Sequence, residues 1–299
     1  MSLKTNYILL CFLLGFWATN AQYSLNYNLK IGDSYKIEQV ANQEIIQNMN
    51  GSEHRMHNLI EGTFIFKVEH INDSIITFDF AFDRFKMSST SSMMGELMNV
   101  DTNDSIALDD VEGKLFSGLT TSSLKMLMLK NGDIKEIYGT GTMVDHMIES
   151  AGDFNDFTKD LMKEAMKKEF GGKNLSESFE QLTFIYPDTK VKKGEIWQTE
   201  YKGKVSAINN WTLDKISKEL LRITGQSDVN YKTNDESLTM DLSGKTESEI
   251  VAFRPSGFIK SMTSISNAKG TSVIKNMEGL EVPTTMTTKI TYKVTKDVQ

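Results

Sequence analysis

Residues 63–83, TFIFKVEHINDSIITFDFAFD, decide how this chain folds. Apolar side chains alternate with polar ones at Phe64, Phe66 and Val68, and the alternation resumes from Ile76 after the polar stretch INDS. A period of two residues is typical of a β-strand with one buried face. The stretch therefore predicts an antiparallel hairpin whose aromatic face is turned toward the core.

The same alternation extends along the chain in both directions. It predicts a strand over 23–31 and a hairpin over 124–137, LKMLMLKNGDIKEI, which turns at Asn131-Gly132. Strands are expected again after residue 184 and continue to KITYKV at 289–294. Most of the chain is therefore predicted to be antiparallel sheet.

The periodicity changes in the middle of the chain. In residues 155–172, NDFTKDLMKEAMKKEFGG, apolar residues recur three and four positions apart, as on one face of a helix. Asn155 is a suitable N-cap, and Gly171-Gly172 ends the pattern. We expect helices over roughly 142–183.

Two short stretches each recur later in the chain with partial sequence similarity. LKIGDSY at 29–35 returns as VKKGEIW at 191–197, and GDIKEI at 132–137 returns as GFIKSM at 257–262. A duplicated unit explains these echoes, and the coincidence of common turn residues is the alternative.

These patterns predict a mainly β (α+β) protein with two related curved antiparallel sheets, each a β-meander, and a mid-chain helical segment. The predicted parts are a signal peptide over 1–21, a first β-meander over 22–140, a helical linker over 141–184 and a second β-meander over 185–299.

The N-terminus has the pattern of an export signal. Lys4 precedes the apolar run YILLCFLLGFW, and small residues follow it, which predicts cleavage between Ala21 and Gln22. Cys11 is the only cysteine, and lipidation at Cys11 is the alternative. The mature chain is expected to have no disulfide and no membrane span, which suits a bacterial periplasm or cell surface.

The chain resembles a domain-of-unknown-function family of exported Gram-negative envelope proteins. The resemblance rests on the signal peptide, on YNLKIGDSYKI at 27–37, on the mid-chain helix and on YPDTKVKKGEIW at 186–197. It implies a location in the periplasm or on the cell surface, and it carries over no activity and no site. More loosely, the expected fold is similar to periplasmic lipoprotein carriers.

Charge and motifs exclude several functions. The formal net charge is −7 and no basic cluster is present, so nucleic-acid binding is not expected. The chain has no nucleophile elbow, phosphate-binding loop, zinc-protease helix or dinucleotide fingerprint. We therefore expect no catalytic residue, no cofactor and no enzyme activity.

Two stretches could bind a metal ion. Residues 101–112, DTNDSIALDDVE, have oxygen donors at calcium-loop spacing, but Ile106 stands where the turn needs glycine, and we expect a solvated turn followed by a short strand. The donors are Asp101, Asn103, Ser105, Asp109 and Glu112. His54 and His57 in HRMH would point to opposite faces of a strand. No metal site is predicted.

Two classes of function remain foremost. The first is a non-enzymatic interaction module for another envelope component. The alternative is a periplasmic carrier of a lipid or other hydrophobic ligand, held in a concave sheet lined by Phe and Met. Residues that could line such a site are Phe64, Phe66, Phe78, Phe80, Phe82, Met126, Met128, Met162 and Met166, and core packing would explain the same residues.

Overall fold

The computed structural model describes residues 21–49, 51–234, 238–275, 277 and 279–297. The predicted signal peptide lies outside the described residues, apart from Ala21. Among the described residues, none of the helices combines the length and the apolar character needed to cross a bilayer.

The described chain consists mainly of strands, with helices in its middle, as the sequence predicts. The strands are β1 (Gln22–Tyr23), β2 (Ser34–Met49), β3 (Ser52–Ile71), β4 (Ile75–Ser91), β5 (Gly95–Asp101), β6 (Ser123–Leu129), β7 (Ile134–Tyr138), β8 (Val191–Lys192), β9 (Ile196–Tyr201), β10 (Val205–Ile216), β11 (Leu220–Asn234), β12 (Leu238–Phe253), β13 (Ile259–Ile274) and β14 (Leu280–Asp297). The helices are α2 (Val111–Ser117), the 3-10 helix η1 (Gly118–Thr121), α3 (Thr140–Ala151), α4 (Asp156–Phe170) and α5 (Gly172–Thr183).

The protein is mainly β, and its two meanders are the two halves of one antiparallel sheet. The sheet has 12 strands in the order β7-β6-β4-β3-β2-β14-β13-β12-β11-β10-β9, and β5 pairs with β4 outside this path. Strands β2 and β14 pair along most of their length and join the halves. The boundaries predicted for the two units and their linker stay a prediction.

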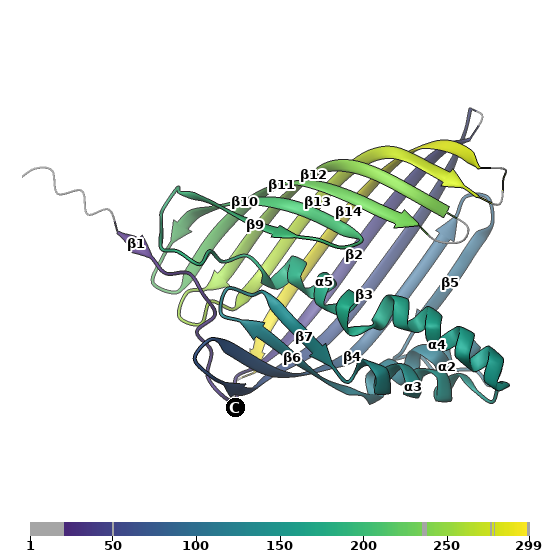
Figure 1. Ribbon diagram of the computed structural model, residues 1–299, viewed down its shortest axis with the longest axis horizontal. Helices are drawn as coiled ribbons and strands as arrows, with labels where there is room; N and C mark the ends of the chain where they lie inside the picture. Colours follow the sequence, from purple (N-terminus) through teal and green to yellow (C-terminus); the bar gives the residue numbers. More distant parts are fainter. Residues whose placement is uncertain (1–20, 50, 235–237, 276, 278, 298–299) are drawn as a thin grey trace, which may run out of the picture.

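The sheet curls around the mid-chain helices without closing (Figure 1). Helix α5 lies between the two edges of the curl, which are formed by β7 and β9. Hydrogen bonds tie the C-terminal end of α5 to both sides: Thr183 Oγ1 donates to the Gly132 carbonyl at 2.7 Å, and Trp197 Nε1 donates to the Ile185 carbonyl at 2.8 Å. The helices therefore cover one part of the inner face of the sheet.

The predicted aromatic hairpin is confirmed, and it forms the centre of the core. Strands β3 and β4 pair Phe64 with Phe82 and Phe66 with Phe80. The ring of Phe179 from α5 packs edge-on against Phe80 with a centroid distance of 4.9 Å. Such aromatic pairs add about 0.5–1.5 kcal/mol each beyond the burial of their area, so this contact fixes α5 on the sheet.

The mid-chain helices are also confirmed. Asn155 caps α4, because its side-chain Oδ1 accepts a hydrogen bond from the Thr158 amide at 2.9 Å. Gly139 precedes α3 in a left-handed conformation, and Gly171 separates α4 from α5.

The first pair of echoed stretches folds into the same turn twice. The Lys30 amide donates to the Asp33 carboxylate at 2.9 Å, and the Lys192 amide donates to the Glu195 carboxylate at 2.7 Å. The glycine between lysine and acid has a positive φ in both turns, and an inward-facing aromatic residue follows two positions after the acid. The sequence similarity of these two stretches therefore reflects a shared turn structure, while their origin by duplication stays a prediction.

The strand expected over 23–31 is largely wrong. Only Gln22–Tyr23 pairs as a strand, with β8. The rest of the segment is extended, but the Tyr27 amide donates to the Lys130 carbonyl and the Asn28 amide to the Ser256 carbonyl, which belong to two different turns. The alternation arises because the segment buries every second side chain, without a neighbouring strand to pair with.

The short strand expected after residue 105 is wrong as well. The predicted Asx turn forms, since the Asn103 amide donates to Asp101 Oδ1 at 3.1 Å, but no strand follows it among the described residues. Instead α2 begins at Val111, where Asp110 Oδ1 accepts from the Gly113 amide at 2.7 Å. A side-chain N-cap of this kind stabilises a helix by about 1 kcal/mol.

Candidate functional site

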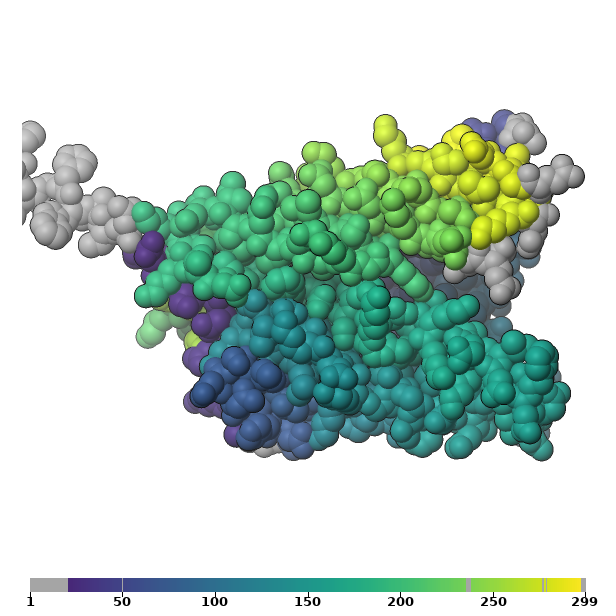
Figure 2. All heavy atoms as spheres, viewed as in Figure 1, coloured from purple at the N-terminus to yellow at the C-terminus, as the bar shows by residue number. Residues whose placement is uncertain are grey.

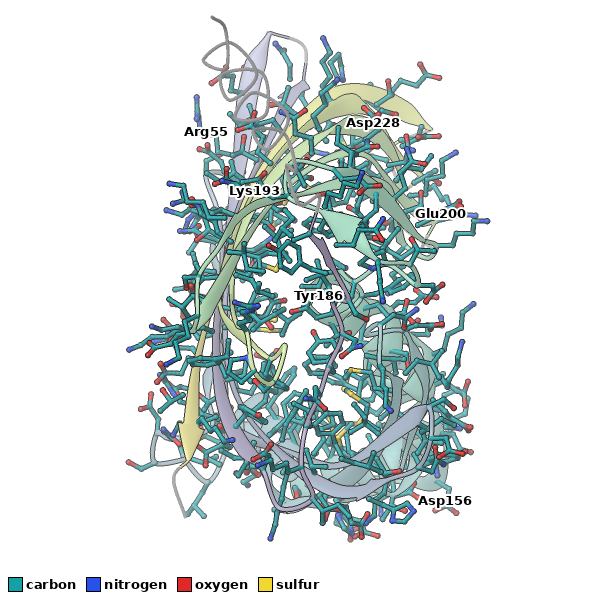
Figure 3. The ribbon with its side chains drawn as sticks, turned by 90° about the vertical axis from the view of Figure 1, so that its left-hand side faces the viewer. Arg55, Asp156, Tyr186, Lys193, Glu200 and Asp228 are labelled. Carbon is teal, nitrogen blue, oxygen red and sulfur yellow. The ribbon has the colours of Figure 1, made fainter. Side chains whose placement is uncertain are left out.

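The inner face of the curl is almost free of formal charge. Along every described strand of the large sheet, side chains alternate between an outer face and this inner face, which is turned toward the helices. Among the inner positions of the described strands, Lys296 at the end of β14 is the one charged residue; it lies opposite Tyr35 and forms an ion pair with Asp33 at 2.7 Å. The ion pairs between strands, such as Lys36–Asp83 and Arg222–Glu249, lie on the outer face. Figure 3 shows Arg55 and Glu200 at the periphery of the molecule and Tyr186 near its centre.

One part of the inner face is closed core. The sequence-predicted lining residues Phe64, Phe66, Phe78, Phe80, Phe82, Met126 and Met128 are all buried there, and Met162 and Met166 of α4 are half-buried against it. The structure therefore brings the predicted residues together, packed against α5. Their role in binding a ligand stays a prediction.

A second part of the inner face is half-exposed, and we call it the inner trough. Its residues come from three adjacent strands: Gln39, Ala41 and Gln43 of β2, Asn58 and Ile60 of β3, and Met87 and Ser89 of β4. The helical layer does not bury these side chains, yet all of them are apolar or neutral polar. Figure 2 shows a hollow between the layer of β10–β13 and the helices, with fainter and more distant atoms on its floor.

A row of hydrogen bonds crosses the inner trough. Ser89 Oγ donates to Asn58 Oδ1 at 2.7 Å, Asn58 Nδ2 donates to Gln43 Oε1 at 3.0 Å, and Gln43 Nε2 lies 3.4 Å from Thr288 Oγ1. These contacts hold the amide side chains in fixed orientations. The row ends at Thr288, which also lines the space described next.

Beside the trough lies a small inner cavity of about 40 Å³. This volume exceeds the roughly 10–15 Å³ that one water molecule needs. The lining consists of aromatic, hydroxyl, amide and aliphatic side chains from β9–β14, with Gln181 of α5: Tyr201, Val205, Asn209, Trp211, Ser227, Val229, Tyr231, Thr246, Ser248, Met262, Ser264, Ser266, Thr288, Ile290 and Tyr292. The cavity is lined by β14 and the trough by β2, and these two strands pair with each other.

The polar groups around the cavity are fixed by one another. Trp211 Nε1 donates to Thr199 Oγ1 at 2.9 Å, and Ser227 Oγ donates to Asn209 Oδ1 at 2.5 Å. The Tyr231 hydroxyl donates to Ser266 Oγ at 2.8 Å. Buried hydroxyl and amide groups satisfied in this way cost little free energy and give the cavity a defined shape.

Two tyrosines at the cavity are different. No described residue forms a hydrogen bond with the hydroxyl of Tyr201 or of Tyr292. Burial raises the pKa of both phenols well above the usual value; the nearby Tyr231 phenol raises the pKa of Tyr201 further, and the Tyr201 phenol raises that of Tyr292. Both hydroxyls therefore stay neutral at physiological pH and remain available as hydrogen-bond donors.

Among the described residues, the titratable groups outside this region do not assemble into a metal site. No cluster of three or more His, Cys, Asp or Glu side chains in the described part of the chain is arranged to hold a metal ion. The calcium-loop candidate Asp101 instead accepts from Arg84, whose Nε lies 3.0 Å from Oδ1, and this ion pair lowers the pKa of the Asp101 carboxyl. His54 is buried between Gln47 and Ser91, which hydrogen-bond its two ring nitrogens.

The trough and the cavity were not predicted because many of their residues are polar. A signal was nevertheless present in the parity of the strands. In β13, Ser264 and Ser266 stand at the same parity as Met262, and in β10, Asn209 stands at the same parity as Trp211. Small polar residues that continue a buried apolar row indicate an inner surface that is not filled by core.

Comparison with protein families finds one match. The model of a family of unknown function, DUF6263, matches residues 73–259, which is more than half of the chain. The chain belongs to the DUF6263 family. The predicted membership of a domain-of-unknown-function family is thereby confirmed, while the Gram-negative envelope location of the DUF6263 chain stays a prediction. A comparison with curated proteins finds no match.

Several solved structures are similar in part. A lipovitellin structure that describes lipid–protein interactions aligns with a TM-score of 0.48 and 12% identity over 89% of this chain, which spans only 25% of the lipovitellin chain. An outer membrane channel from Pseudomonas putida F1 aligns with a TM-score of 0.26 and 5% sequence identity. This alignment covers 90% of this chain and 97% of the channel chain. The translocator domain of the autotransporter NalP from Neisseria meningitidis aligns with a TM-score of 0.23 and 7% sequence identity, and the alignment covers 89% of each chain. These scores are low, so the function is argued from the chain's own residues.

Proposed function

We propose that this protein is a non-enzymatic exported binding protein that carries an uncharged, largely apolar ligand in its inner trough. One observation carries the proposal: the inner trough has no charged side chain although it is half-exposed. A sheet face that only needed to be solvated would accept Lys and Glu, as the outer face of the same strands does.

The composition of the trough determines the class of ligand. A charged group placed there would lose water without gaining a counter-ion, which is costly in a partly buried site. Ile60 and Met87 offer apolar contact, and Met adapts its shape to irregular ligands. The amides of Gln43 and Asn58 and the free phenols of Tyr201 and Tyr292 offer neutral hydrogen bonds at one side. An amphipathic molecule with an uncharged polar end fits both parts.

The absence of catalytic activity is part of the same proposal. His54 is the one imidazole at the inner positions of the described strands, and both of its nitrogens are engaged by Gln47 and Ser91. The tyrosines at the cavity hold their protons at physiological pH, because their pKa values are raised. Neither arrangement suits a general base.

The test is native mass spectrometry of the mature protein purified from its own envelope, followed by organic extraction. We expect an uncharged amphipathic compound in the wild type and its loss in Ile60→Asp, because the new carboxylate lies in the trough. Val40→Asp is the matched control, since Val40 is exposed on the outer face of the neighbouring strand β2. An apo mass for the wild type after incubation with envelope extract contradicts the proposal, as does equal loading of both variants.

A second candidate is an interaction module that binds another envelope protein, and a groove on the outer face favours it. The groove has a volume of about 570 Å³ and crosses β9–β13, with Ile196 and Ile265 exposed beside the Arg222–Glu249 ion pair. An apolar patch rimmed by charges is typical of a protein interface. Cross-linking in the envelope, with Ile265→Lys as the disrupting variant, tests this candidate.

A further inference from the structure

One end of the molecule concentrates apolar side chains in places where polar residues are usual. Of the fourteen large apolar residues exposed in the described part of the chain, five lie on three elements at this end: Met93 and Met94 between β4 and β5, Met277 between β13 and β14, and Phe157 and Leu161 in α4. Their exposed fractions run from 55% for Met277 to 73% for Phe157.

The three elements surround the outlet of the hollow. In Figure 1 the β4–β5 turn, the β13–β14 turn and the end of α4 that lies away from α5 all reach the right-hand end of the molecule. The hollow in Figure 2 lies between the upper turns and the helices. We call these five residues the apolar rim.

The local structure gives no internal reason for the rim to be apolar. The amides of Met93 and Met94 donate to Ser91 Oγ, which forms the turn, while their side chains remain exposed. In α4 the half-buried face contains Met162 and Met166, so Phe157 and Leu161 lie on the opposite face of the helix. Turns normally carry Gly, Asn, Asp or Ser.

We propose that the apolar rim docks onto the surface of a lipid bilayer, where the ligand enters or leaves the trough. The passage of a ligand at the membrane rests on the proposed function. The docking itself is inferred from the exposed residues of the apolar rim. The apolar residues stand on separate elements on either side of a hollow, not on one continuous patch. A protein partner would need a matching surface across the gap, whereas fluid lipid surrounds each projection separately.

Charge does not drive this docking. The chain has a formal net charge of −7, and lysines of α4 already pair with neighbouring acids: Lys159 with Asp153, and Lys163 with Asp145. Attraction to anionic lipids requires unpaired basic residues near the surface. The rim should therefore bind zwitterionic vesicles through burial of apolar area, with little dependence on salt.

The test is co-sedimentation of the full mature chain with phosphatidylcholine vesicles. We expect the wild type to bind. A variant combining Met93→Ser, Met94→Ser and Phe157→Ser should have a vesicle affinity lower by about tenfold or more. A variant combining Ile208→Ser and Ile265→Ser is the matched control, because both residues are exposed on the outer face. Because all these positions are exposed, we expect the variants to keep their fold, and circular dichroism is the measurement that checks this.

The outcomes separate the two proposals. Absent binding of the wild type, equal binding of the two variants, or binding that needs anionic lipid and low salt overturns docking by the rim. In the same experiment, the amount of ligand extracted from the rim variant and from Ile60→Asp is measured. Ligand found without vesicle binding overturns the rim and leaves the carrier function standing, whereas rim-dependent binding without any ligand does the reverse.

Discussion

Replacing Gly132 by alanine should destabilise the protein more than the conformation of this residue alone explains. Gly132 has a φ of +99°, and a Cβ atom there would overlap the carbonyl oxygen of Thr183 at the end of α5. The left-handed φ costs an alanine about 1–2 kcal/mol. Moving Thr183 also strains its hydrogen bond to the Gly132 carbonyl and the bond from the Tyr27 hydroxyl to the Thr183 carbonyl, each worth about 1 kcal/mol.

The expected loss in the free energy of unfolding is therefore about 3 kcal/mol for Gly132→Ala. Gly194→Ala is the matched control, because Gly194 has a φ of +80° but no atom within 4 Å of an added Cβ. It should lose only the conformational part, about 1–2 kcal/mol. Urea unfolding followed by linear extrapolation measures both. If the two variants lose the same free energy of unfolding, the close approach of α5 to this turn does not stabilise the fold.

Three further predictions concern the core, pH and metal ions. Phe80→Ala should lower the free energy of unfolding by about 3–5 kcal/mol in urea, because Phe80 is fully buried; a loss below about 1 kcal/mol would mean that the aromatic core is loose. Burial, and then the negative charge of Asp133, raise the pKa of Glu180 to about 6. The folded state therefore binds the proton more tightly than the unfolded state, and stability should fall as the pH rises from about 4.5 through 6. Glu180→Gln should flatten this dependence, and an unchanged pH profile in that variant would assign it to another group. Calcium should leave the melting temperature unchanged, since Arg84 already pairs with Asp101; a rise that Asp101→Asn abolishes would restore the calcium loop.

Local patterns predicted the elements but not how they assemble. The alternation around Phe64 and Phe80, the Asn131-Gly132 turn and the cap at Asn155 each depend on neighbours within a few residues, so the sequence contains the whole signal. The pairing of β2 with β14 depends on residues such as Gln43 and Thr288, which are 245 positions apart. No local rule connects such residues, so the sequence could not distinguish two sheets from one continuous sheet.

The candidate site was harder to predict for a different reason. Apolar residues such as Phe66 and Met126 suggested a lining surface, but the same composition forms closed core once α5 packs on it. The trough uses Gln43, Asn58 and Ser89, which resemble outward-facing residues until the register is known. Whether an inner polar residue meets water, protein or ligand depends on what covers the sheet, and that is set by tertiary packing.

The junction between β2 and β14 also determines the order in which the chain can fold. Strand β2 lies in the middle of the finished sheet, yet one of its edges has no partner until β14 has left the ribosome. Until then a long strand presents unpaired amides and carbonyls, the arrangement that recruits other chains into aggregates. Pairing strands so far apart in sequence is also slow. A holding chaperone that keeps the chain open until β14 has been synthesised would therefore raise the yield of folded protein more than faster synthesis would.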